Sequence, residues 1–366
     1  MDMPAGREKE YSRQKIQLSI WRTVLTFVFL LAILVTGVSA YIRNRVANWS
    51  GNFYLQAALY LIIFRIIYDA VFLALDYYSS FTLEHKYSLS NQTFFDWVKQ
   101  SLKKWLLSLL LFMLAADGLY AILRYFPIHW WLVAMAGWFI LSIVLGKLAP
   151  VLIIPLFYKC IKLENNELKE KLLKLSAACN VKIKEVFEIQ LSKETKKANA
   201  AVVGFGKNKR ILLADSLMQN YTNDEIEAIF AHELGHICLH HITKIFFFGA
   251  AVSFVVFYLA YVSFDKTMTL FDFEHVYDVA AFPLLVLIFS IAGLIFLPIQ
   301  NSFTRRMEKQ ADLFAVSQIE NSENLASSLS KLGKQNLSDP NPSKIVRFFF
   351  YSHPPISERI TYIHKE

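Results

Sequence analysis

The sequence predicts a mainly α-helical, polytopic membrane protein with a smaller soluble part that contains a short β-sheet. Hydrophobic residues make up 55% of the 366 positions, with 31 Phe and 17 Tyr, and the mean hydropathy is +0.36. This composition is typical of membrane proteins. In addition, several apolar runs are about as long as a bilayer-spanning helix needs to be, roughly 20 residues.

Six apolar runs are expected to span the membrane. They cover approximately residues 23–42, 53–78, 105–123, 130–157, 244–263 and 279–299. The first run follows a polar, basic stretch (1–22) and is followed by no convincing cleavage site, so we interpret it as a span and not as a signal peptide. Pro150 and Pro155 predict a kink or a broken end in the fourth.

The second run carries Arg65, Asp69 and Asp76. Charged side chains within a span usually face the interior of the bundle or a water-filled cavity. A hydrated chamber between the helices is one interpretation. The alternative is an ordinary ion pair, because Arg65 and Asp69 are four residues apart and share a helix face.

Residues 159–222 are soluble in character. An amphipathic helix is expected over 163–178, short strands over 186–191 and 210–213, and a hairpin turn near Gly204-Phe205-Gly206. The resulting division is 1–158 for the first spans, 159–243 for the first soluble part, 244–300 for two further spans, and 301–366 for the second soluble part.

The charge distribution predicts the orientation in the membrane. The N-terminus, 79–104, 159–243 and 301–366 are the basic segments, and an even number of spans separates them, which places all four in the cytoplasm. The acidic loop 264–278 then lies on the opposite side. The net charge of +8 is explained by these segments, so no nucleic-acid partner is expected, and the three cysteines show no metal-ligand or disulfide spacing.

Residues 232–236 read His-Glu-Leu-Gly-His. On a helix, His232 and His236 project from one face and can bind one zinc ion, with Glu233 beside it as a general base. Thr222 and Glu225 form a capping-box pattern just before this helix. A chance match is the alternative, but three ionisable groups in an apolar helix are costly to bury unless a metal compensates them.

A catalytic zinc requires a third protein ligand and an open position. The metzincin pattern is excluded because Leu239 and Ile242 stand where it needs Gly and His. His240 cannot complete a tetrahedron from the same straight helix, so His240 and His241 are interpreted as polar residues at its exit. Glu308 is the better candidate, with Asp312 one turn later as an acceptor for a ligand histidine.

These residues resemble the integral-membrane zinc endopeptidases of the CAAX prenyl protease 1 type, whose relatives include the HtpX-type membrane proteases. The resemblance extends from about residue 84 onward. It rests on 84–93, 150–157, 199–200, 232–236, 308–312 and 351–359. Ser88 departs from the glycine that is usual in the family, and the family usually has seven spans where six are counted here.

The resemblance implies a gluzincin-type fold with one Zn²⁺ per chain, bound by His232, His236 and Glu308. It further implies that His353 stabilises the oxyanion beside the base Glu233. Three residues complete the expected site: Arg359 pairs with Asp312, while Asn199 and Ala200 contact the substrate backbone.

The expected partners are the lipid bilayer and a peptide or protein in extended or unfolded form, cleaved at a site near or within the cytoplasmic boundary of the membrane. Two alternatives remain open at this stage. The first is a quality-control protease for misfolded membrane proteins, the role of HtpX-type relatives. The second is a catalytically silent scaffold, against which the intact Glu233 argues.

Overall fold

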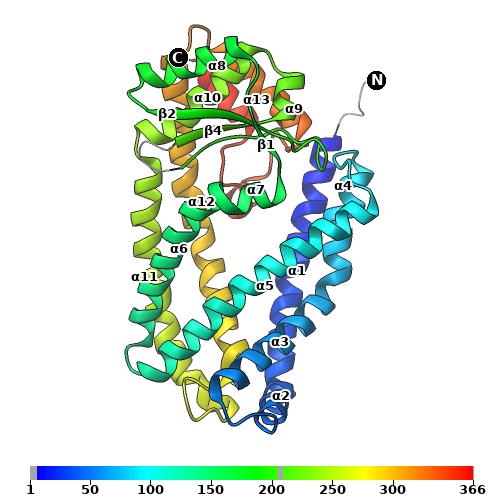
Figure 1. The fold of residues 1–366 in the computed structure, drawn as a ribbon, viewed down its shortest axis with the longest axis vertical. Helices are drawn as coiled ribbons and strands as arrows, with labels where there is room; N and C mark the ends of the chain where they lie inside the picture. The colour runs from blue at the N-terminus through cyan, green and yellow to red at the C-terminus, as the bar shows by residue number, and fades with distance from the viewer. Residues whose placement is uncertain (1–5, 205–208, 366) are drawn as a thin grey trace.

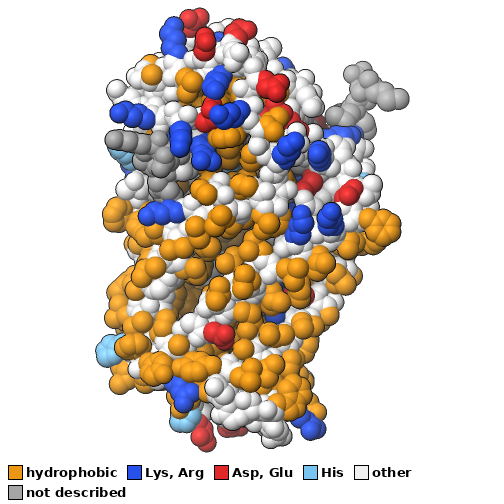
Figure 2. Space-filling view, viewed as in Figure 1, with side chains coloured by type: hydrophobic (Ala, Val, Ile, Leu, Met, Phe, Trp, Pro, Cys, Tyr) orange, Lys and Arg blue, Asp and Glu red, His pale blue; other side chains and the backbone are white. Residues whose placement is uncertain are grey.

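The computed structural model describes residues 6–204 and 209–365. Within them, six helices are long and apolar enough to cross a membrane, which confirms the predicted polytopic class (Figure 1). These are α1 (Arg7–Val35), α3 (Phe53–Tyr77), α5 (Phe94–Tyr125), α6 (Trp130–Leu148), α11 (His241–Met268) and α12 (Phe282–Gln318). Figure 2 shows a broad apolar surface over these helices, with Lys and Arg side chains along its border with the soluble part.

The first span differs from its predicted bounds. Helix α1 already begins at Arg7, within the polar stretch, and ends at Val35, before the chain turns at Gly37 (φ 73°) into α2 (Val38–Ala47). Glycine adopts this left-handed conformation without steric cost. The polar half of α1 is helical because it packs on the soluble part: Tyr11 is buried, and its hydroxyl donates to Glu84 Oε1 at 2.6 Å.

Two spans end in π-helical turns. Tyr78–Thr82 leads from α3 into α4 (Leu83–Lys86), and Ala149–Ile153 leads from α6 into α7 (Ile154–Phe157). The second turn contains Pro150, and its wider hydrogen-bonding pattern accommodates a residue that has no N–H to donate. The irregularity predicted at the prolines therefore takes the form of a π turn.

The charges within α3 are paired. Arg65 Nε lies 2.6 Å from Asp69 Oδ2, Trp105 Nε1 donates to the same oxygen at 2.7 Å, and Asp76 pairs with Arg22 of α1. Arg65 and Asp69 therefore form the ion pair that was the alternative interpretation of these charges. These side chains join neighbouring helices and do not by themselves indicate a hydrated chamber.

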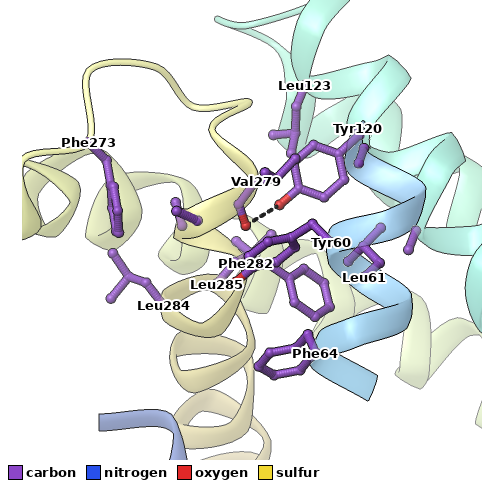
Figure 3. Packing of buried hydrophobic residues seen from close by; sticks show 14 of the residues in the cluster. Tyr60, Leu61, Phe64, Tyr120, Leu123, Phe273, Val279, Phe282, Leu284 and Leu285 are labelled. Atoms are coloured by element: carbon purple, nitrogen blue, oxygen red, sulfur yellow. Dashed lines mark hydrogen bonds between the residues drawn. The ribbon is translucent and has the colours of Figure 1, made fainter. Parts of the chain in front are cut away.

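An aromatic core closes the end of the bundle farthest from the sheet (Figure 3). The Tyr60 hydroxyl lies 2.7 Å from Ser39 Oγ, and the Tyr120 hydroxyl donates to the Val279 carbonyl at 3.4 Å. Short 3-10 turns at Thr269–Phe271 and Val279–Ala281 link α11 to α12 here. This end holds the helices together, so the opposite end can carry the soluble part.

The soluble part contains a four-stranded mixed sheet of order β1-β2-β4-β3. The strands are β1 (Cys160–Lys162), β2 (Ile183–Ile189), β3 (Ala200–Val203) and β4 (Lys209–Ala214). β2 and β4 pair in parallel and overlap the two predicted strands, while β3 pairs antiparallel with β4 and leaves a free edge. Of the expected turn near Gly204, Phe205 and Gly206 lie outside the described residues.

Helices from both soluble segments share one core (Figure 1). They are α8 (Asn166–Ala178), α9 (Asp215–Asn220), α10 (Asn223–Cys238), α13 (Glu323–Gln335) and α15 (Ile356–Ile363), while α14 (Lys344–Phe350) packs on α12 outside this core. The expected boundary near residue 300 falls inside α12, whose 37 residues run unbroken from the membrane region into the soluble part. Half of the most apolar segment of this helix is buried, the largest share among the six spans, so α12 is the central helix of the bundle.

Candidate metal centre

The local sequence sets α10 firmly in place. The Thr222 side chain accepts from the Glu225 N–H at 3.2 Å, and the Glu225 carboxylate accepts from the Thr222 N–H at 2.9 Å, as the capping-box pattern predicts. Glu225 is also held by Ser327 and Lys331 of α13, each at 2.7 Å. The start of α10 is therefore held both by its own cap and by α13. Because the helix is continuous, this also fixes where the two histidines lie.

Gly235 allows α10 and α12 to approach closely. A Cβ at this position would lie 3.0 Å from the Ala311 Cα and 3.1 Å from the Ala311 carbonyl oxygen. Those distances are tighter than ordinary van der Waals contact, so a larger residue here would push the backbone of α12 away by a few tenths of an ångström. The close approach is what brings Glu308, on α12, opposite the two histidines.

His232, His236 and Glu308 form the one group of potential metal ligands found among the described residues. The two Nε2 atoms are 3.2 Å apart, and each lies 3.3–3.4 Å from a Glu308 oxygen. Donor atoms bound tetrahedrally to zinc at about 2.1 Å are separated by about 3.4 Å, so the three positions fit a zinc ion. Among the described residues, Glu308 Oε2 is also a buried oxygen that accepts no hydrogen bond.

A buried carboxylate orients the first histidine. His232 Nδ1 lies 2.7 Å from Asp312 Oδ1, which leaves Nε2 with the lone pair that a metal needs. Arg359 donates from Nε and Nη2 to the two Asp312 oxygens, at 2.8 and 2.6 Å, and the Tyr362 hydroxyl donates to Oδ2. Asp312 is fully buried, and the pairing with Arg359 compensates its charge.

A second chain of hydrogen bonds orients the other histidine. His241 Nε2 lies 3.1 Å from Gln310 Oε1, and His241 Nδ1 lies 3.1 Å from His236 Nδ1. Because the Gln310 oxygen can only accept, His241 carries its proton on Nε2 and accepts from His236 Nδ1–H. The His236 Nε2 lone pair is then free for a metal.

The structure agrees with the sequence interpretation of His240, which is an exposed polar residue, and corrects that of His241. α10 ends at Cys238, and His240 adopts a left-handed conformation (φ 55°), so it does not continue the helical face of the ligands. His241 opens α11, is fully buried and contacts His236, whereas it was expected to be a polar exit residue. The spacing of the residues in the sequence does not predict the contact of His241 with His236, because it depends on the change of chain direction at His240.

The remaining expected residues line one cavity of about 640 Å³. Glu233, His353, Asn199 and Ala200 all contribute to its walls, together with the candidate ligands His232 and Glu308. His353 Nε2 lies 3.3 Å from Glu308 Oε1, and its ring is more than half exposed to the cavity side.

Helix α1 forms a wall of the same cavity. Its side chains Tyr11, Ser12, Lys15, Ile16 and Ser19 line the cavity. Lys197, two residues before Asn199, is fixed to this wall through Glu84 Oε2 at 3.0 Å and the Tyr11 hydroxyl at 2.9 Å. A membrane helix therefore completes the site, which the polar character of residues 1–22 did not indicate.

Burial and charge perturb the acidities of these groups. Burial opposes the charged form of His232, but the hydrogen bond to Asp312 and the nearby Glu308 carboxylate outweigh it and raise the pKa of the metal-free ring to about 9. A metal binds the neutral ring, so metal binding at neutral pH must displace this proton. Burial also raises the pKa of Glu233 above its usual range, as suits a general base.

Comparisons with known proteins cover almost the whole chain. Residues 162–366 match the model of peptidase family M48, and residues 5–159 match the model described as the CAAX prenyl protease N-terminal region with five membrane helices. The described residues of this region hold four helices long enough to span a membrane, one fewer than that description.

Individual relatives agree with these matches. The chain is 30% identical to an uncharacterized metalloprotease, YhfN, of Bacillus subtilis, over 98% of this chain and 85% of the relative. It is 33% identical to the CAAX prenyl protease 1 homolog of Arabidopsis thaliana, over 79% and 69%. The crystal structure of S. mikatae Ste24p superimposes with a TM-score of 0.88 at 26% identity, covering 97% of this chain and 88% of that one.

Proposed function

The chain belongs to peptidase family M48 and is a membrane zinc endopeptidase, and from this premise we propose that His232, His236 and Glu308 hold its single zinc ion. The observation that supports this most directly is the spacing of 3.2–3.4 Å between their donor atoms, next to a cavity that also contains Glu233. A zinc ion bound there would leave a fourth position open and lower the pKa of a water molecule that occupies it.

The chain's own residues then carry out the proton transfers. Glu233 accepts the proton of the attacking water and later passes it to the leaving amine, for which its raised pKa is suitable. His353 donates from its ring to the substrate carbonyl oxygen as negative charge develops there. Although the His353 ring is partly exposed, desolvation by the neighbouring groups lowers its pKa, so the neutral ring is the donor.

The substrate is proposed to bind as an extended chain along the free edge of β3. Asn199 and Ala200 lie at the start of that edge and line the cavity. Extended peptides add to such edges through main-chain hydrogen bonds. Because α1 contributes a further wall to this cavity, we expect unfolded or terminal segments to be the substrates.

The basic border seen in Figure 2 supports a cytoplasmic location of the site. The N-terminal part of α1, the connector at Glu84 and the segment at Lys197 meet at this end of the bundle through direct ion pairs. Basic segments that flank spans remain in the cytoplasm.

Chelation of the purified, full-length protein in detergent should abolish casein hydrolysis and remove one zinc ion per chain. Addition of zinc should restore both, because the ligand atoms already have the spacing of a tetrahedral site. Metal content is measured by atomic emission beside the hydrolysis rate. Hydrolysis that persists in zinc-free protein would contradict the proposed mechanism.

Among protease roles, processing of prenylated tails is favoured over general degradation, because the curated relatives at 28–33% identity include CAAX prenyl proteases. A farnesyl group on the cysteine of a peptide ending in Cys-aliphatic-aliphatic-X should raise kcat/KM by about tenfold or more, since a single lipid chain already partitions into a bilayer. The matched control is the same peptide with a free cysteine. Equal rates for both peptides, below that for casein, would favour the quality-control role.

A further inference from the structure

Only some backbone groups along the free edge of β3 and the segment before it are available to pair with a peptide. The Ala214 N–H donates to the Asn199 carbonyl at 2.9 Å, so this carbonyl faces β4. Backbone groups alternate between the two sides of a strand in an antiparallel pair. The N–H and C=O groups of Ala198, Ala200 and Val202 therefore point away from β4, toward the cavity side where a peptide would add.

Asn336 already occupies the first of these positions. Its Oδ1 accepts from the Ala198 N–H at 3.1 Å, and its Nδ2 donates to the Ala198 carbonyl at 3.3 Å. These are the two hydrogen bonds that a neighbouring strand would make with Ala198. The carboxamide of Asn336 thus takes the place of one residue of an added strand.

The outward positions before Ala198 are also occupied. The Lys196 N–H donates to the Leu89 carbonyl at 2.9 Å, and the Asn91 N–H donates to the Glu194 carbonyl at 3.1 Å. The connector between α4 and α5 therefore covers the segment ahead of Asn336. Among the described residues, Ala200 is the first along this edge whose outward backbone groups remain for a peptide.

The position of Asn336 is fixed by the end of α13. The Ser338 N–H donates to the Gly333 carbonyl at 2.9 Å, and the Leu337 N–H donates to the Lys334 carbonyl at 3.3 Å, which is the Schellman pattern. Leu337 has a φ of 52°, where glycine is usual. Its side chain is buried against Tyr11 and Tyr87, and this packing offsets the strained backbone.

We propose that Asn336 is a specificity-determining residue that ends the substrate-binding edge, so that a bound peptide pairs with Ala200 and Val202 and cannot continue past Ala198. The proposal rests on the peptidase function proposed above. Antiparallel pairing is the more stable arrangement and directs the C-terminal side of the peptide toward Asn336. That side must then end, or turn away from the edge, within a few residues of Ala200.

The test uses quenched fluorescent peptides that share one cleaved bond and are lengthened residue by residue on its C-terminal side. For the wild-type protein, kcat/KM should fall once the tail is long enough to reach Ala198. In Asn336→Ala and Asn336→Ser, the ratio of kcat/KM for long-tailed to short-tailed peptides should rise about fivefold to tenfold, the effect of one or two neutral hydrogen bonds. The gain should appear in KM, and in the affinity of long-tailed peptides measured without cleavage in the Glu233→Gln background.

Gln335→Ala is the matched control. Gln335 Nε2 donates to the Lys196 carbonyl at 2.6 Å, so this change loosens the same segment but leaves Ala198 paired with Asn336. The length ratio should stay at its wild-type value in Gln335→Ala, and peptides lengthened on the N-terminal side should show no change in any variant. An equal rise in Gln335→Ala, an unchanged ratio in both Asn336 variants, or an effect confined to N-terminal length would each overturn the proposal. A wild-type protein that cleaves none of the peptides would instead overturn the peptidase function itself.

Discussion

Glu233→Gln should abolish peptide cleavage while the protein keeps its zinc ion. The side chain lines the cavity but contributes no donor atom to the ligand group, so the substitution removes the base and leaves the ligands untouched. Loss of a positioned general base costs about 10²- to 10⁴-fold in rate, enough to bring hydrolysis below detection for an enzyme of ordinary turnover. Zinc content and casein hydrolysis are measured on the same preparation.

Glu227→Gln provides the matched control for this experiment. Glu227 lies on the same helix, α10, where it pairs with Lys171 at 2.9 Å and stays outside the cavity. The same chemical change there should leave both zinc and activity near the wild-type values. Retained proteolysis in Glu233→Gln would show that another group accepts the proton, and a silent scaffold would show no hydrolysis in the wild-type protein either.

The parts of the fold that the sequence predicted well are those encoded by local patterns. The six spans follow from apolar runs, and the start of α10 follows from the pair Thr222 and Glu225. Strands β2 and β4 were found from their β-branched and aliphatic runs, but β1 and β3 were not expected. Each of these two is only three or four residues long and is stabilised by its neighbour, not by its own composition.

The parts that escaped prediction depend on contacts between distant segments. The bend at His240 turns His241 onto His236, and Gln310 joins them from a helix about 70 residues later. The wall that α1 contributes to the cavity depends on Glu84 and Lys197, which are far apart in sequence. Local spacing cannot reveal such partners, because the chain brings them together only when the soluble part packs on the bundle.

The continuity of α12 explains why the metal site depends on the membrane region. The same helix that forms the center of the bundle carries Glu308 and Asp312 a few turns further on. Any tilt of α12 would displace the third ligand from the two histidines of α10, and the absence of a side chain at Gly235 allows the two helices to lie close enough for the three ligands to meet. The bundle therefore acts as the support on which the ligand geometry is built.

Glu308→Ala should lose both zinc and activity, whereas Asp312→Ala should retain part of each. Removing the Glu308 carboxylate leaves two histidine donors, and a catalytic zinc site needs three protein ligands. Asp312 touches His232 only through Nδ1, so its loss should weaken zinc binding by about 10- to 100-fold. Zinc affinity is measured by competition with a chelator, and activity by casein hydrolysis. Glu320→Ala, the same change at an exposed site just beyond α12, is the control and should behave as wild type.

The unfolding temperatures of metal-free wild type and metal-free Glu308→Ala test the role of Glu308 independently of activity. Glu308 is buried, and in the metal-free protein its charge is compensated by the protonated His232, whose Nε2 lies 3.3 Å from Glu308 Oε2. Glu308→Ala removes this partner, so without zinc it should unfold at a lower temperature than the metal-free wild type. Wild-type protein should be stabilised by added zinc, and Glu308→Ala should not. If Glu308→Ala instead binds zinc normally, the third ligand lies elsewhere, and His353, with Nε2 at 3.3 Å from Glu308 Oε1, becomes the first residue to replace.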